Sequence, residues 1–335
     1  MSKVVKTKHT SLSLNEEKML LRVVPLIFGV VAISWGVFTT IKMRSTNQLT
    51  RFDELFPSTV YINTPSELMS IKRKDMNSQY ILMNDLTFES STDLFDKNID
   101  FTGVLEGNGH TINIKGTAIN SLFYKVGSKG EIKDLKINYI NDVEPVEKNF
   151  GGIATINEGK IQNVKVEFSK TLSLKEHEFV GGIAAINNGE ISKSISIVDF
   201  KETEKFVKNY SYGGIVGNAL GGKVTQIVTM VNSEFLIDHK QDIIDGVASS
   251  PKVAYSVAAR AEKSETSLIY TLDNEQQFID RTQPFVTLKS EDELKVGRFY
   301  TSAEYGLTFP TKIWKVEDGN IPELIPNCLY VKGGE

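Results

Sequence analysis

The strongest hydrophobic signal in the chain is an uncharged run of 19 residues from Val23 to Ile41. A helix of this length spans roughly 28 Å, close to the roughly 30 Å hydrocarbon core of a bilayer. Its apolar residues occupy every side of the helix, and basic residues flank it at both ends. We therefore predict one transmembrane helix at residues 23–41. No small-x-small site follows it, so we expect an anchor rather than a cleaved signal peptide.

Basic side chains set the expected orientation of this helix. Five precede it within residues 1–22 and fewer follow it closely. The positive-inside rule then places residues 1–22 in the cytoplasm and the large domain outside the cell membrane. Ala32 and Gly36 form a small-xxx-small pair that would let two such helices approach closely, and the oligomeric state stays open. The expected partner of this segment is the lipid bilayer.

A second pattern repeats after a predicted linker at residues 42–60. Each unit is a short apolar strand, an Asn/Gly turn and a β-branched strand; two copies read GGIATINEGKI and GGIAAINNGEI, and degenerate copies lie on either side. The glycine before the second strand recurs at spacings of 29, 30 and 33 residues. Asn and Gly tolerate the left-handed conformation expected at such a corner. The predicted turn residues are Gly130, Asn157, Gly159, Asn187, Gly189, Asn218 and Gly222.

A unit of about thirty residues cannot bury its own apolar face, whereas stacked units share one core. We therefore predict an all-β parallel solenoid at residues 61–327, followed by a tail at 328–335. Leu135 and Val164 should occupy one inward slot, but Ser194 falls where the next unit needs an apolar residue. Either a one-residue slip or a small inward residue would explain this. An antiparallel sandwich or barrel is the competing architecture.

Two helix starts are expected to cap the solenoid. Thr64 to Leu68 combines a helix N-cap, proline at N1 and glutamate at N3, and predicts a helix to about Lys74. Ser290 begins a second such segment. The Gly107-Asn108-Gly109 stretch has the composition of a hairpin turn, which is the feature that favours the antiparallel alternative.

Several of these segments, taken in order, resemble GLUG-type β-helix domains of bacterial cell surfaces. Such domains include the N-terminal region of IgA-protease-type zinc metallopeptidases of Gram-positive bacteria. The likeness covers roughly residues 60–326 and rests on Tyr80–Leu86, Phe101–Ile112, Leu122-Phe123, the repeats at 151–161 and 181–191, and the segments Phe299–Trp314 and Asp318–Leu324. It implies a right-handed parallel β-helix. It does not imply the protease, which belongs to another domain of those enzymes.

Charge and composition exclude several classes of function. Residues 1–44 hold seven of the 38 basic side chains but only two of the 42 acidic ones, so the remainder is acidic and nucleic acid is not an expected partner. Cys328 is the single cysteine, which excludes an intrachain disulfide and a cysteine metal cluster. The hydrophobic and charged fractions, 40% and 24%, are those of a folded protein.

The chain carries no recognisable catalytic or cofactor motif. His177-Glu178 lacks the second histidine of a zinc protease, and His110 is expected to be an exposed turn residue. The glycine-rich segment 213–217 lacks the lysine of a phosphate loop and predicts tight packing between coils. Two groups of acids are candidates for carbohydrate chemistry: Asp93, Asp96 and Asp100, and Asp238, Asp242 and Asp245.

These observations predict a membrane-anchored, non-catalytic surface scaffold without cofactor or metal. It would bind or position an envelope protein or a glycan as part of a cell-surface assembly. The alternative is a carbohydrate-active lyase or hydrolase on a β-helix. That alternative requires carboxylates from adjacent coils to converge in a groove.

Overall fold

The computed structural model describes most of the region in which the repeats occur. The described residues are 59–71, 77–89, 100–174, 177–202, 211–233, 254–255, 265–272 and 286–327. The chain divides after Pro57 into two units, and all described residues belong to the second. The predicted span from Val23 to Ile41, the segment 1–22 and the tail 328–335 lie outside these residues. Within the described ranges, no helix combines the length and apolar character that a membrane span requires.

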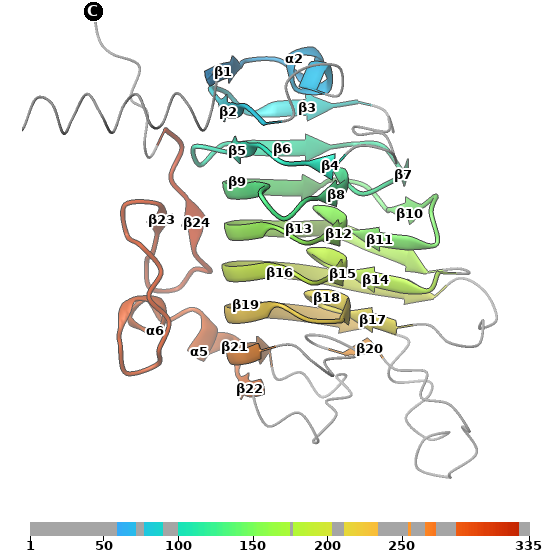
Figure 1. Cartoon of the computed structure of the whole chain (residues 1–335). Helices are drawn as coiled ribbons and strands as arrows, with labels where there is room; N and C mark the ends of the chain where they lie inside the picture. The colour runs from blue at the N-terminus through green and yellow to red at the C-terminus, as the bar shows by residue number, and fades with distance from the viewer. Residues whose placement is uncertain are drawn as a thin grey trace, which may run out of the picture. The chain divides into compact units, whose positions relative to one another are not determined.

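The second unit winds into a parallel β-solenoid whose coils are stacked like rungs (Figure 1). An 11-stranded large sheet forms its longest side. Its strands, in spatial order, are β1 (Thr59–Ile62), β2 (Gln79–Leu82), β5 (Val104–Glu106), β9 (Glu131–Tyr139), β13 (Lys160–Leu174), β16 (Glu190–Glu202), β19 (Lys223–Ser233), β21 (Glu265–Leu272) and β22 (Val286–Lys289), with β3 (Leu86–Phe88) and β6 (Thr111–Ile114) joined through β9. The first strand begins at Thr59, two residues before the predicted domain boundary.

Two shorter parallel sheets complete each coil. The middle sheet contains β4 (Asp100–Phe101), β8 (Phe123–Val126), β12 (Ala154–Asn157), β15 (Ala184–Asn187) and β18 (Val216–Ala219). The short sheet contains β11 (Asn149–Gly151), β14 (Phe179–Gly181), β17 (Ser211–Gly213) and β20 (Ala254–Tyr255), and β7 (Ala118–Ile119) pairs with β10 (Glu144–Pro145). Every pair within the solenoid is parallel, which confirms the predicted architecture and excludes the antiparallel alternative.

The GNG segment at 107–109 is a bend within a coil and not a hairpin. The strands on its two sides, β5 and β6, both pair in parallel with β9. A hairpin would have paired them with each other. The prediction of a hairpin-type turn was therefore wrong, because the same glycine and asparagine chemistry serves a strand bend.

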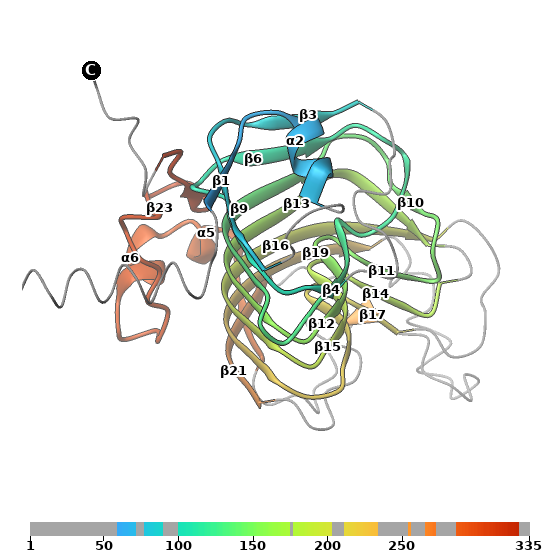
Figure 2. The same cartoon turned by 45° about the horizontal axis from the view of Figure 1, so that its top comes forward.

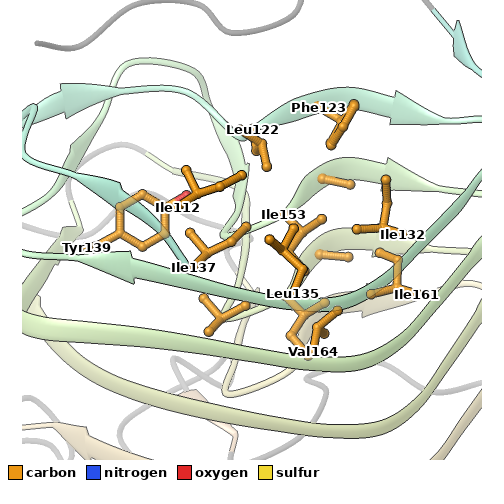
Figure 3. Packing of buried hydrophobic residues seen from close by; sticks show 14 of the residues in the cluster. Ile112, Leu122, Phe123, Ile132, Leu135, Ile137, Tyr139, Ile153, Ile161 and Val164 are labelled. Carbon is orange, nitrogen blue, oxygen red and sulfur yellow. The ribbon is translucent and has the colours of Figure 1, made fainter. Parts of the chain in front are cut away.

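Stacked apolar residues fill the interior (Figure 3). Leu135 lies opposite Val164 in the parallel register, as predicted, and both are fully buried. Ser194 occupies the next rung of this column and is also fully buried. Its hydroxyl donates to the Ser192 carbonyl (2.7 Å) and accepts from the Val164 amide (3.3 Å). The small inward residue is therefore the correct explanation, and the register does not slip at Ser194.

The predicted turn glycines form a column for a reason other than left-handed backbone. Only Gly222 has a positive φ (70°); Gly130, Gly159 and Gly189 do not. A Cβ atom on Gly159, Gly189 or Gly222 would press against the carbonyl oxygen of the glycine one coil earlier. Those carbonyls accept bonds from the next coil, as Gly130 does from the Lys160 amide (2.9 Å). Glycine is required because the backbones stack closely.

Short helices close two different sides of the solenoid. Helix α2 (Pro65–Ser70) has the predicted capping box at Thr64 and buries Leu68 in the core at the N-terminal end of the stack (Figure 1). Helix α5 (Glu291–Leu294) has the predicted capping box at Ser290. It covers the outer face of the large sheet, not the end of the stack as expected (Figure 2).

Residues 290–327, which we call the C-terminal strap, run along that outer face. They contain α5, α6 (Gly297–Thr301) and the antiparallel pair β23 (Trp314–Lys315) and β24 (Glu323–Leu324). One outward row of the large sheet explains this path. The row reads Lys136, Lys165, Ile195, Val228 and Tyr270 from coil to coil. Its last three members pack in a second hydrophobic cluster with Leu294, Phe299, Tyr300, Leu307, Phe309, Trp314 and Leu324.

Candidate functional site: a polar corner beneath the C-terminal strap

One residue per coil adopts a left-handed backbone where the large sheet bends. These residues are Asn108, Asp134, Asn163, Lys193, Gln226 and Leu268, with φ between 51° and 56°. The parallel ladder passes over them, so that their side chains lie at the bend and outside the regular alternation of faces. Asn and Asp adopt this conformation most readily, which suits the first three positions. The bend therefore collects polar side chains from successive coils.

A buried pair of carboxyl groups lies at this corner. Glu106 comes from β5 and Asp134 from β9, and they are only 1% and 2% exposed. Lys133 Nζ lies 3.1 Å from Glu106 Oε2, and the Asn108 amide donates to Glu106 Oε1 at 3.0 Å. Asn163, at the equivalent bend one coil further, is also buried. Two acids from adjacent coils thus share a desolvated site with one ammonium group.

The burial of these groups determines their protonation. Burial, and then the charge of Asp134, raises the pKa of Glu106 to about 7 against the opposing effect of Lys133. Burial also raises the pKa of Asp134, although hydrogen bonds from Asn163 and Glu106 oppose that rise. Burial acts to lower the pKa of Lys133, but the charges of Glu106 and Glu131 outweigh it and the pKa is raised.

His110 lies beside this pair and is 6% exposed, so the expectation of an exposed turn side chain was wrong. Its Nδ1 lies 3.1 Å from Asp85 Oδ1, and its Nε2 lies 3.2 Å from Asn327 Oδ1 at the end of the strap. The Asn327 amide donates to the Asn108 carbonyl at 2.8 Å. The imidazole therefore joins the loop before β3 to the last described residue of the strap.

An ion cluster adjoins the corner on the same face. Glu323 of the strap lies between Lys136, at 3.2 Å, and Lys165, with which it forms a second, shorter ion pair. The Lys165 side chain is only 3% exposed, whereas that of Glu323 is 48% exposed. Glu167 lies 3.8 Å from Lys165 and 3.0 Å from Lys136. Glu323 and Glu167 together thus balance the charges of the two lysines that lie against the strap.

The Glu323 carboxylate offers a direct test of this contact. We expect Glu323→Gln to lower the free energy of unfolding by about 1–3 kcal/mol, because Lys165 stays buried and loses a charged acceptor. The exposure of Glu323 places the value toward the low end of that range. Glu317→Gln, which breaks the exposed pair with Lys315, should change it by less than about 0.5 kcal/mol. Chemical denaturation compares the two; equal losses would contradict the buried contact.

The other predicted turn residues lie away from this corner. Asn157 and Asn187 are fully buried and stacked, with Asn157 Nδ2 donating to Asn187 Oδ1 at 2.7 Å. Asn218 does not continue the ladder, because Ala219 is the residue opposite Asn187. His177 is buried and its Nε2 donates to the Pro145 carbonyl at 3.0 Å. These residues are parts of the packing.

The predicted acid groups do not form a site in the described part of the chain. Asp100 pairs with Lys125 at 3.1 Å, and the other candidate aspartates lie outside the described residues. Across the described ranges, no set of three or more His, Cys, Asp or Glu residues could hold a metal ion. Sequence reasoning missed Glu106 and Asp134. The signal that could have found Asp134 is its alignment with Asn163 in the next unit, because Asp and Asn at one repeated position indicate a left-handed bend.

The fold and this corner define a parallel β-solenoid fastened along its side by its own C-terminal segment. Comparison of the chain with protein-family models, with curated proteins and with solved structures finds no significant match.

Proposed function

We propose that this chain is a non-catalytic surface scaffold anchored in a membrane through residues 23–41. Residues 1–22 would lie in the cytoplasm and the solenoid outside, where it would position an envelope protein or a glycan. We also propose right-handed winding, the hand of nearly all parallel β connections and of the GLUG-type domains that the sequence resembles. The observation that carries the non-catalytic role is the burial of the acid pair at the polar corner: Glu106 and Asp134 are only 1% and 2% exposed, so a substrate cannot reach them.

The outer charges of the large sheet support a protein or glycan partner over a polyanion. One row reads Glu131, Lys160, Glu190, Lys223 and Glu265 across successive coils. Charges of alternating sign neutralise one another along the sheet and give no continuous basic track for a phosphate chain. Such a row is typical of the solvent-exposed face of a rigid scaffold.

Topology can be tested with the single natural cysteine removed. In a Cys328→Ser background we expect Val146→Cys, at a position 63% exposed, to react with a membrane-impermeant maleimide on intact cells. Ser11→Cys, before the predicted span, should react only after permeabilisation. Labelling of both positions from outside, or recovery of the chain in the soluble fraction, would contradict the anchored orientation.

The scaffold role needs a separate experiment. Full-length protein should be cross-linked in its native membrane and purified in detergent, and the same should be done with a variant lacking residues 1–44. We expect one envelope component to co-purify reproducibly with the full-length chain. The same component should not co-purify with the variant that lacks residues 1–44. Recovery of no component under cross-linking would argue against a scaffold.

A carbohydrate-active enzyme is the second candidate, because Glu106 and Asp134 come from adjacent coils and Glu106 holds a proton near neutral pH. Their burial beneath the strap opposes it, since an acid must reach the bond that it cleaves. The discriminating assay is the release of new chain ends from wall or extracellular polysaccharide. Cleavage that is lost in Glu106→Gln would overturn the scaffold proposal.

A further inference from the structure

We propose that the polar corner is a proton-controlled latch that fastens the end of the C-terminal strap to the first coils. Proton uptake closes the latch, and proton loss releases residues 323–327 from β5, β6 and β9. This inference goes beyond the scaffold role and does not depend on the identity of any partner.

His110 lies between two acceptors. Asp85 Oδ1 faces one ring nitrogen and Asn327 Oδ1 faces the other. A neutral imidazole carries one N–H and can donate to only one of them, whereas an imidazolium donates to both. Asn327 Oδ1 is also 3.4 Å from Asn108 Nδ2, which sets the orientation of the Asn327 amide as an acceptor toward His110. The strap contact is complete only when His110 is protonated.

The proton on Glu106 sets the charge balance of the buried site. With Glu106 protonated, Asp134 and Lys133 leave the desolvated site neutral. Loss of that proton leaves two carboxylates against one ammonium group, and like charges in a site of low polarity repel strongly. The other charged groups nearby are Glu131 on β9, Asp85 before β3, and Glu323 with Lys136, Lys165 and Glu167 beyond the corner. None of them is a cation free to compensate the new charge.

Asn108 connects these events to the strap. Its amide donates to Glu106, its carbonyl accepts from the Asn327 amide, and its side chain lies against Asn327 Oδ1 and the Leu82 carbonyl. Gly109 adds a steric fit, because a Cβ there would collide with the Ile325 carbonyl. A rearrangement of ionised Glu106 therefore acts on the residue that holds the strap end.

The titration of Glu106 sets the direction of the pH effect. A buried acid whose pKa is raised to about 7 contributes stability that is fully present below its ordinary value and is lost as the pH rises through 7. The latch is thus closed in mild acid and loosened in mild alkali.

Hydrogen exchange on the full-length protein tests the latch. The reporter is the Asn327 amide, with exchange corrected for the intrinsic effect of pH. We expect its protection to fall at least about tenfold from about pH 6 to about pH 8.5, the effect of one proton bound to the closed state. Amides of β13 within residues 160–168 should keep their protection.

Two variants keep the test decisive. Glu106→Gln retains an acceptor for the Asn108 amide and cannot ionise, so it should flatten the pH profile. His110→Gln removes the imidazole that contacts Asn327 and should lower the protection at both pH values. Glu89→Gln, in an exposed pair with Lys115, is the matched control and should behave as wild type. Protection that is independent of pH in the wild type would overturn the latch. So would an unchanged profile in whichever corner variant folds, as shown by native protection of β13.

Discussion

Gly182→Ala is expected to lower the free energy of unfolding by about 3 kcal/mol and to reduce soluble yield sharply. A Cβ at Gly182 would press against the Gly214 carbonyl oxygen and the Ser196 hydroxyl. Ser196 could rotate, but the Gly214 carbonyl is backbone of the next coil and cannot move without separating the coils. Inserting atoms into such a contact typically costs 1–3 kcal/mol and occasionally more. Urea denaturation followed by circular dichroism measures the effect.

Gly221→Ala is the matched control for this substitution. Gly221 lies in a turn between β18 and β19, and the nearest atom to its added Cβ would be Asn188 Oδ1 at 3.5 Å, an ordinary contact. We expect a change within about 0.5 kcal/mol. Equal destabilisation by both substitutions would show that contact between coils is not the reason that position 182 requires glycine.

Trp314→Ala should produce the second large effect. We expect it to lower the free energy of unfolding by about 3–5 kcal/mol, because it removes a large buried side chain from the strap. Trp314 is 1% exposed and packs against Phe309 with the two rings tilted and their centroids 5.0 Å apart. Its removal opens the cluster that covers the outward apolar residues Ile195 and Val228. We expect increased binding of a hydrophobic dye together with an earlier unfolding transition.

Lys315→Ala tests whether this result is specific to the buried ring. Lys315 is the next residue in β23, its side chain is 61% exposed, and it pairs only with Glu317 among the described contacts. It should leave both dye binding and stability close to wild type. If Trp314→Ala also left the dye signal unchanged, the strap would not be what covers the outer face.

Apolar positions on β16 and β19 show how far pattern alone could lead. Ile191 points inward and Ile195 outward, yet both are fully buried. A strand with two buried faces does not alternate cleanly between apolar and polar residues. The ambiguity at Ser194 arose because the strap that buries the second face of β16 comes about a hundred residues further along the chain.

The sequence by itself determined the parallel stack, the columns of Leu135 and Val164, and both capping boxes. Each depends on residues a few positions apart or on a repeat of about thirty, and such regularities are visible in one dimension. Only the tertiary structure decided the lateral path of the strap, the left-handed bend and the meeting of Glu106 with Asp134. Those features join elements as distant as His110 and Asn327, which lie 217 positions apart. Their energetics come from burial and close approach between surfaces that no local pattern relates.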